Sequence, residues 1–361
     1  MLNRITGKTA LRAVALGAVI ATAALGLAGC TGSTGTTSDD KIGVALIVKT
    51  NSNPFFVAMQ DGAKAAADDA GVSLTLAAGK EDGDEDTQIK AIEDAIARGD
   101  QGILITPNGP GVLDAIAKAR DAGLYVIALD TPPDPADAVD ITFATDNRLA
   151  GQLIGEWTAA QLNGDKATIA LLDLFDDKIV SVDYNRDQGF LEGMGIDVAD
   201  GNVNGDEATT GTYSGGDYEI VGNEASNGAE DGGLAAMETL LSKNPDINVV
   251  YTINEPAAYG AYQALQAAGK TEGVIIVSVD GGCAGVANVK DGIIGATSQQ
   301  YPVKMAELGV QAIVDLAKNG TKPSVSDGLD FFNTGVALVT DTPAEGVESI
   351  DTTEASSICW G

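Results

Sequence analysis

The sequence predicts an α/β protein with two doubly wound parallel sheets, and three observations support that fold class. From residue 42 onward, short apolar segments alternate with longer segments of helical periodicity, as in parallel sheets covered by helices. Segments such as 42–48 are nearly continuous apolar runs rich in β-branched residues, which is typical of strands buried on both faces. The alternation stops at 145–147 and then starts again. Two similar halves predict two lobes with a cleft between them.

The first half sets out its elements in order. Strands are expected at 42–48, 72–77, 102–106, 125–129 and 141–144, with helices at 54–70, 87–98 and 111–122 between them. Pro54 suits the first turn of its helix, and Phe55 and Phe56 open an apolar stripe at helical spacing. On this evidence alone, both Phe residues are better explained as core than as site.

The second half repeats the pattern with a longer interruption. Strands are expected at 168–172, 218–221, 249–253, 274–279 and 293–297, and helices at 149–162, 188–194, 234–241 and 257–268. The stretch 195–217 is rich in Gly, Asp, Asn and Thr and is expected to be a long surface loop.

Two acidic stretches have part of the spacing of a calcium loop. Asp200–Gly205 lacks the Glu that the twelfth position of an EF-hand requires. Asp82–Glu93 lacks the turn Gly, and Asp86 there is better explained as a helix N-cap. Neither pattern is complete, so no metal ligand is assigned.

The composition narrows the function classes. The 361 residues carry a net charge of -31, which argues against nucleic-acid binding because phosphate recognition needs a basic surface. The chain has no His, so it lacks the commonest general base and zinc ligand. The acidity is interpreted as a solvated surface, and no cofactor is expected.

The N-terminus is interpreted as an export signal. Residues 1–29 carry Arg4, Lys8 and Arg12 and then an uncharged apolar stretch, the layout of a secretory signal peptide. The stretch ends in L-A-G-C at 27–30, which resembles a bacterial lipobox and makes Cys30 the expected lipidated residue. A retained membrane anchor is the alternative. Residues 30–40 are expected to be a flexible tether.

Polar side chains stand near the carboxyl ends of the predicted strands, and Arg186 is expected at the start of helix 188–194. Because ligands of open α/β sheets bind beyond these ends, the side chains predict a site in the cleft. Carboxylates, amides and an Arg pair well with sugar hydroxyls, which both donate and accept. Phe55 and Phe56 would stack on the C–H face of a sugar. The polar set is Lys49, Asn53, Asp130, Arg186, Asn254, Asp280 and Gln300.

With these residues placed, the chain resembles the type I periplasmic binding proteins of ribose-type ABC sugar importers, from residue 41 to about 340. It is most similar to the fructose-binding members, because Lys49 and Thr131 stand where ribose binders have Ser and Arg. The motifs are N-P-F-F at 53–56, L-D-T-P at 129–132, A-T-D-N at 144–147, R-D-Q-G-F at 186–190, T-I-N-E-P-A-A at 252–258, V-S-V-D-G-G-C at 277–283 and G-A-T-S-Q-Q-Y-P at 295–302.

The resemblance implies a site and a domain layout. The implied sugar ligands are Asn53, Phe55, Phe56, Asp130, Arg186, Asn254, Asp280 and Gln300, and the aromatic that the second lobe of ribose binders contributes has no confident match. Three hinge crossings are expected near 145–146, 300–301 and 333–335. They divide the chain into lobe one (41–145 plus 301–333) and lobe two (146–300 plus 334–361).

This layout also brings two cysteines together. A tail that follows the third crossing lies on lobe two, as Cys283 does. Since thiols outside the cytoplasm tend to oxidise, a Cys283–Cys359 disulfide is expected, with two unpaired buried cysteines as the alternative.

The function expected from all this is an extracytoplasmic, lipid-anchored, monomeric receptor. It binds a monosaccharide, fructose or a similar sugar, and delivers it to an ABC permease and its ATPase subunits. A sugar sensor for a chemotaxis or histidine-kinase partner is the alternative. A cell-surface glycosidase is a weaker alternative, because Asp130 and Asp280 face hydroxyls rather than a scissile bond.

Overall fold

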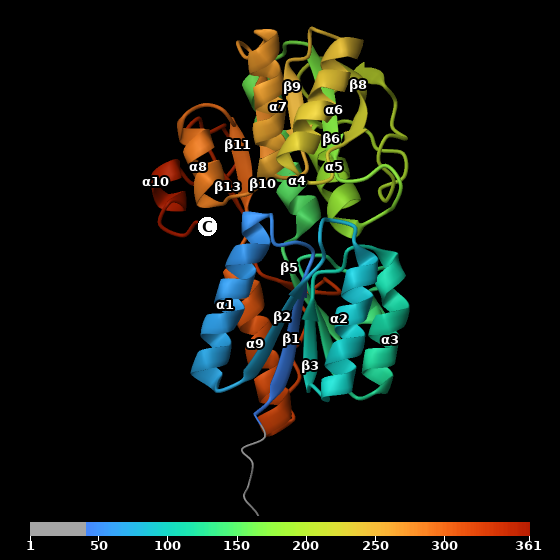
Figure 1. Ribbon diagram of the computed structural model, residues 1–361. Helices are drawn as coiled ribbons and strands as arrows, with labels where there is room; N and C mark the ends of the chain where they lie inside the picture. Colours follow the sequence, from blue (N-terminus) through green and yellow to red (C-terminus); the bar gives the residue numbers. More distant parts are fainter. Residues whose placement is uncertain (1–40) are drawn as a thin grey trace, which may run out of the picture. The chain divides into compact units, whose positions relative to one another are not determined.

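The computed structural model describes residues 41–361 (Figure 1). The expected signal peptide (1–29), the tether (30–40) and Cys30 lie outside the described residues. The first sheet has the order β12-β5-β4-β3-β1-β2, and all of its pairs are parallel. Its strands are β1 (Gly43–Val48), β2 (Ser73–Ala78), β3 (Gly102–Ile105), β4 (Tyr125–Leu129), β5 (Ile141–Ala144) and β12 (Phe332–Asn333).

Helices cover both faces of the first sheet (Figure 1). On one face α1 (Pro54–Ala70) and α9 (Pro302–Asn319) pack on Leu46 and Leu104, and on the other α2 (Glu85–Arg98) and α3 (Leu113–Asp121) pack on Ile47 and Ile103. Two short 3-10 helices, η1 (Pro110–Val112) and η2 (Ala136–Ala138), complete this lobe. The apolar runs of its strands are therefore buried on both faces, as expected for a parallel sheet.

The second sheet has the order β13-β11-β10-β9-β6-β8-β7. Its five central strands are parallel and repeat the order of the first sheet, while β7 and β13 are antiparallel edge strands. The strands are β6 (Ala167–Asp173), β7 (Thr210–Thr212), β8 (Asp217–Ala225), β9 (Val249–Thr252), β10 (Ile275–Asp280), β11 (Ala296–Gln299) and β13 (Ala337–Val339). The fold is thus the doubly wound α/β type that the sequence predicts, with antiparallel edges added.

Four helices cover the second sheet. One face carries α4 (Asn147–Leu162) and α5 (Ser181–Met194), and the other carries α6 (Glu230–Lys243) and α7 (Glu255–Ala268). The helices α8 (Cys283–Lys290) and α10 (Thr352–Ala355) lie beside the β11 and β13 edge (Figure 1).

Helices α4 and α5 meet backbone to backbone. A Cβ on Gly151 or Gly155 would collide with the carbonyl of Arg186 or Phe190, and a Cβ on Gly189 would collide with that of Arg148. Glycine at these positions allows the two helices to approach more closely than larger residues would. The contact fixes how α5 is placed relative to α4, and it therefore fixes the position of Arg186 on α5.

The chain passes between the two sheets three times. It leaves the first sheet after β5, returns after β11 into α9, and leaves again between β12 and β13. Thr145 donates a hydrogen bond to the Gly335 carbonyl at 3.4 Å, which ties the first passage to the third. We call the part of the chain around the first sheet the first lobe and the part around the second sheet the second lobe.

Three details differ from the sequence-based expectations. Arg186 does not begin its helix but lies inside α5, which starts at Ser181. The apolar periodicity of the sequence does not reveal this start, because the first turns bury mostly polar side chains. The stretch 195–217 is not only loop, since it contains β7 and the buried Tyr213. The N-cap of α2 is Asp84, whose carboxylate accepts from the Thr87 amide at 3.1 Å, so Asp86 is not the cap.

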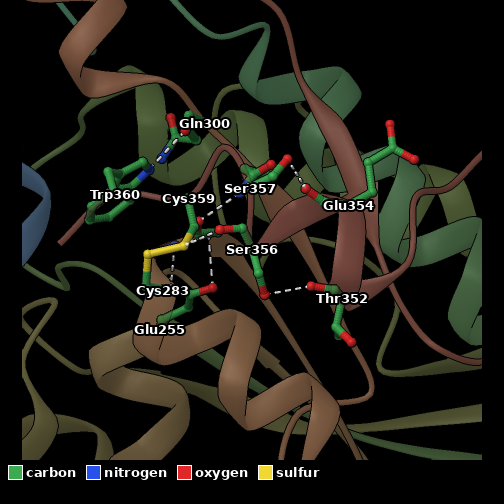
Figure 2. The surroundings of a disulfide bond; sticks show 12 residues. Glu255, Cys283, Gln300, Thr352, Glu354, Ser356, Ser357, Cys359 and Trp360 are labelled. Carbon is green, nitrogen blue, oxygen red and sulfur yellow. Dashed lines mark hydrogen bonds between the residues drawn. A yellow bond between two sulfur atoms is a disulfide. The ribbon is translucent and has the colours of Figure 1, made fainter.

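A disulfide ties the C-terminal tail to the second lobe. Cys283, the first residue of α8, forms a disulfide with Cys359, and Figure 2 shows the bond with its surroundings. The disulfide expected from the sequence is therefore present in the structure. No helix within residues 41–361 has the length and apolar character needed to cross a membrane.

Candidate functional site

The carboxyl ends of strands from both sheets surround one small cavity. Its volume is about 30 Å³, and its lining comes from both lobes. All nine polar and aromatic residues that the sequence analysis placed in the site line this cavity, together with four that it did not. The lining residues are Lys49, Asn53, Phe55, Phe56, Asp82, Asp130, Leu174, Val182, Arg186, Ile253, Asn254, Asp280 and Gln300.

The first lobe supplies the aromatic wall. Asn53 is the N-cap of α1, and its side-chain oxygen accepts from the Phe55 amide at 2.9 Å. This cap starts the helix one residue before the two Phe residues. Their rings form an edge-to-face pair with centroids 5.3 Å apart, and both also belong to the core cluster of the first lobe. Phe55 and Phe56 therefore belong to the core and also line the cavity, while their contact with a sugar stays a prediction.

Asp130 carries the charge at the centre of the site. It follows β4 directly and lies 3.8 Å from the Lys49 ammonium and 3.7 Å from the Arg186 guanidinium. These distances are ion pairs rather than hydrogen bonds. Since Arg186 comes from the second lobe, one of the pairs joins the two lobes. The remaining oxygen capacity of the carboxylate is available to ligand hydroxyls.

Neighbours in the second lobe hold the rest of the Arg186 guanidinium. Its Nε donates to Asn147 Oδ1 at 2.7 Å, and Nη1 donates to the Ile253 carbonyl at 2.9 Å. Asn254, next along the chain, caps α7 by accepting from the Ala257 amide at 3.1 Å and donates to the Gly228 carbonyl at 2.9 Å. Both side chains are thus held in place by protein contacts.

The wall of the second lobe is aliphatic. The described residues of this lobe contribute Leu174, Val182 and Ile253, which line the cavity and pack together. These residues are not among the predicted site residues. Leu174 and Ile253 follow strands and Val182 lies in the first turn of α5, and apolar residues at such places have the same appearance in a sequence as core residues.

Two buried acids stand side by side at the end of β10. Asp280 accepts from Gln300 Nε2 at 3.0 Å, and Glu255 accepts from the Gly281 and Gly282 amides at 2.9 and 3.1 Å. Desolvation raises the pKa of Asp280 to about 7, against the attraction of Arg186. Desolvation and the neighbouring Asp280 raise the pKa of Glu255 to about 8. The pair therefore holds protons near neutral pH.

Gln300 and Asp82 add two further polar groups. Gln300 Oε1 is buried and has no hydrogen-bond partner among the described residues, so it is an acceptor aimed at no protein group. Asp82 is partly exposed, and desolvation raises its pKa to about 6, against the attraction of Lys49. In the sequence, Asp82 stands out only as part of an incomplete calcium pattern. No three acidic or thiol side chains within residues 41–361 converge as a metal site.

The cavity is too small for a sugar as it stands. A volume of about 30 Å³ holds only a few water molecules, since one water needs about 10–15 Å³ by this measure. Asn53, Asp82 and Asp280 also line a much larger outer groove of about 1480 Å³, so the cavity borders that groove. Residues of both lobes therefore enclose the cavity on the side away from the groove.

The comparisons with known proteins agree with this geometry. Residues 44–322 match the sequence profile of the periplasmic binding protein domain. A D-ribose/D-allose-binding protein of Pseudomonas aeruginosa is 29% identical over 313 residues, which cover 83% of this chain and 89% of that protein. A ribose import binding protein of Haemophilus influenzae is 30% identical over 268 residues, which cover 74% and 82%.

A solved structure shares the fold. It is an ABC transporter solute-binding protein from Agrobacterium vitis with bound D-fucose, 25% identical, with a TM-score of 0.71 over 88% of this chain and 100% of that chain. The profile covers most of the chain, and its relatives bind substrates without transforming them. The chain therefore belongs to the periplasmic binding proteins, as a type I sugar-binding protein of ABC importers and not an enzyme.

Proposed function

We propose that this protein binds a ketohexose of the fructose type between its lobes and presents it to an ABC permease. The observation that carries the proposal is Lys49, a buried cation beside Asp130 at 3.8 Å. A lysine here adds three donors to the first lobe. It gives Asp130 a second cationic neighbour in addition to Arg186. A sugar that carries an extra hydroxyl near Lys49 can accept a hydrogen bond from the Lys49 ammonium.

The rest of the site suits the ring of a monosaccharide. Phe55 and Phe56 offer an aromatic face to the C–H side of the sugar, and the aliphatic wall of the second lobe covers the other side. Asp130, Asp280, Arg186 and Gln300 offer acceptors and donors at the edges. A mixture of both signs fits a neutral polyol better than a charged ligand, because each hydroxyl both donates and accepts.

The proposal extends to the setting of the receptor. Cys30 carries the lipid anchor, the mature chain acts as a monomer on the outer side of the membrane, and closure on the sugar creates the shape that the permease reads. Replacement of Cys30 by Ser is expected to leave the chain without metabolically incorporated lipid label. Unchanged labelling of the variant would remove the anchor from the proposal.

A panel of monosaccharides tests the sugar. Thermal unfolding of the mature protein is followed with D-fructose, D-tagatose, D-ribose, D-allose and D-galactose, because a ligand that binds only the folded state raises the unfolding temperature. The largest rise is expected with D-fructose or D-tagatose. A larger rise with D-ribose would reject the ketohexose, and no rise with any sugar, repeated by calorimetry, would reject the site.

A further inference from the structure

The C-terminal tail is fastened to the second lobe up to its last residues. Thr352 donates from its amide and its hydroxyl to the Asp341 carboxylate at 2.9 and 2.8 Å. Ala355 packs in a small apolar cluster with Val286 and Val339. The disulfide then joins Cys359 to Cys283 at the start of α8. Every anchor of the tail up to this point belongs to the second lobe.

Trp360, the next residue, reaches the first lobe. Its ring stands edge-to-face on Phe55 with centroids 5.3 Å apart, and only 8% of the residue is exposed. It packs in the core cluster that otherwise consists of first-lobe residues. On its other side the indole lies against Gly282, where a Cβ would be 3.2 Å from two ring carbons. Trp360 is therefore held between the backbone of one lobe and the aromatic wall of the other.

Two hydrogen bonds fix the orientation of the indole. Trp360 Nε1 donates to the Gln300 carbonyl at 2.9 Å, and the Trp360 carbonyl accepts from the Cys283 amide at 2.9 Å (Figure 2 shows Trp360 beside Gln300 and the disulfide). Gln300 in turn donates from its side chain to Asp280. The indole thus contacts Phe55 and Gln300, which line the sugar cavity, without being among the lining residues itself.

We propose that Trp360 is a positioning residue for sugar binding, which clasps Phe55 from the second lobe when the lobes close and which the Cys283–Cys359 disulfide holds in place. The inference rests on the proposed function, because it assigns a part in closure to a residue outside the sugar cavity. Because Phe55 belongs to the first lobe and Trp360 is tied to the second, opening of the lobes is expected to separate the two rings. A contact that favours the closed state raises the apparent affinity for the sugar in proportion to the closed population.

The size of the effect follows from the contact. An aromatic pair contributes beyond its buried area, and removal of the ring also leaves one side of Phe55 unsupported. Replacement of Trp360 by Ala is expected to weaken sugar binding at least tenfold. Trp360→Phe keeps an aromatic ring but loses the bond to Gln300, so a loss of about threefold is expected. The double variant Cys283→Ser/Cys359→Ser frees the tail and should lie between these two values.

The chain offers a matched control. Its other tryptophan, Trp157, is also buried and donates its Nε1 to a carbonyl, that of Thr342 at 2.8 Å, but both groups lie in the second lobe. Trp157→Phe removes the same kind of contact without touching the lobe boundary. It is expected to bind D-fructose as the parent does.

The experiment combines calorimetry with fluorescence on the mature protein. Each variant is titrated with D-fructose and, in parallel, with D-ribose and D-allose, at a temperature where circular dichroism shows all variants folded. Trp157→Phe leaves Trp360 as the single indole, so its emission should shift to shorter wavelength and become less accessible to acrylamide when sugar is added. Small-angle scattering follows lobe closure in the same samples.

Each outcome bears on one claim. A parent that binds no sugar and shows no compaction rejects the proposed receptor function itself. A parent that binds and compacts, while Trp360→Ala binds within twofold of it, rejects the clasp alone. The clasp is also rejected if the Trp360 emission stays unchanged while scattering shows closure. Weaker binding by Trp157→Phe equal to that of Trp360→Phe would mean that the effect is general destabilisation.

Discussion

Asp130 and Asp280 occupy equivalent places in the two lobes and have opposite surroundings. Strands β4 and β10 hold the same position in the shared strand order, and both acids have a positive φ, 64° and 149°. Such backbone strain gathers at binding sites. Asp130 lies between Lys49 and Arg186, whereas Asp280 lies beside the Glu255 carboxyl. The two lobes therefore share a strand order but surround their equivalent acids with different charged groups.

The difference assigns different roles to the two acids. Two cations balance the carboxylate of Asp130, so it offers lone pairs only. The pair of Asp280 and Glu255 holds protons near neutral pH, because burial raises the pKa of each acid. A protonated carboxyl donates a hydrogen bond as well as accepting one. In the site, the carboxylate of Asp130 can only accept hydrogen bonds, whereas the carboxyl of Asp280 can either donate or accept.

The largest effect is expected when Asp130 is replaced by Ala. The change leaves Lys49 and Arg186 buried without their shared partner, and breaking a buried pair in this way costs about 3–5 kcal/mol. D-fructose binding should fall more than a hundredfold by calorimetry, and the unfolding temperature should drop. As a control, Asp94→Ala breaks an exposed pair with Lys90 on α2, where the expected cost is under about 1 kcal/mol. If Asp130→Ala and Asp94→Ala changed sugar affinity and unfolding temperature equally, Asp130 would have no special role in the site.

Asp280→Ala is expected to weaken sugar binding while leaving the stability of the fold largely unchanged. The change removes the partner of Gln300 Nε2 and of a sugar hydroxyl, and each buried polar group left unpaired costs about 1–3 kcal/mol, so D-fructose binding should weaken at least thirtyfold. Stability should not fall as it does for Asp130→Ala, because the Glu255 carboxyl loses an acidic neighbour. Calorimetry and thermal unfolding on the two variants test this contrast. A parent-like affinity for every sugar would show that Asp280 does not contact the ligand.

Much of this arrangement could be predicted from the sequence, because the signals were local. Buried parallel strands are continuous apolar runs, and the first helix is marked by Asn53, Pro54 and the apolar stripe behind them. The polar residues at strand ends follow from the geometry of α/β sheets. This geometry predicts the seven polar residues of the site, whereas Phe55 and Phe56 look like core residues in the sequence and are placed in the site only by the resemblance to sugar-binding proteins.

Other features depend on contacts between distant segments and left no local signal. The start of α5 was missed because Asp183, Arg186 and Asp187 are buried on a helix that has almost no apolar side in its first turns. The proton-holding pair was missed because Glu255 and Asp280 approach each other only when β9 and β10 pair. Leu174, Val182 and Ile253 look like any other core residues.

The pH dependence of stability probes the acid pair further. A carboxyl whose pKa is raised in the folded state stabilises the fold fully below its unfolded pKa, and this contribution is lost as pH rises through the folded value. With pKa values of about 7 and about 8 for Asp280 and Glu255, the sugar-free protein should lose several kcal/mol of unfolding free energy between pH 5 and pH 8, since each pKa unit corresponds to about 1.4 kcal/mol. Urea unfolding at several pH values measures this.

Glu255→Gln is the matched variant for the pH experiment. The amide keeps the size of the side chain but cannot ionise, so the decline between pH 5 and pH 8 should become smaller. A decline as steep as that of the parent would place the titrating groups elsewhere, for example at Asp173 or Asp187, whose pKa values are also raised by burial.

The smallest loss of sugar affinity is expected when Lys49, the cation of the first lobe beside Asp130, is replaced. Lys49→Ser should weaken D-fructose binding by about fivefold, the equivalent of about 1 kcal/mol, and change D-ribose binding less. Arg186 remains to pair with Asp130, so stability should hold. Calorimetry with both sugars gives the ratio of the two affinities, and an unchanged ratio would remove Lys49 from sugar selection.

The glycine contacts between α4 and α5 limit how the binding preference of this receptor can be altered. Because the helix backbones touch at Gly151, Gly155 and Gly189, any side chain added there would push α5 outward and carry Arg186 with it. Efforts to obtain a receptor for a different sugar, or a biosensor of lower affinity, should leave this helix pair untouched. Lys49 and Leu174, on the loops that follow β1 and β6, line the cavity without capping a helix, and they are the better starting points for a library.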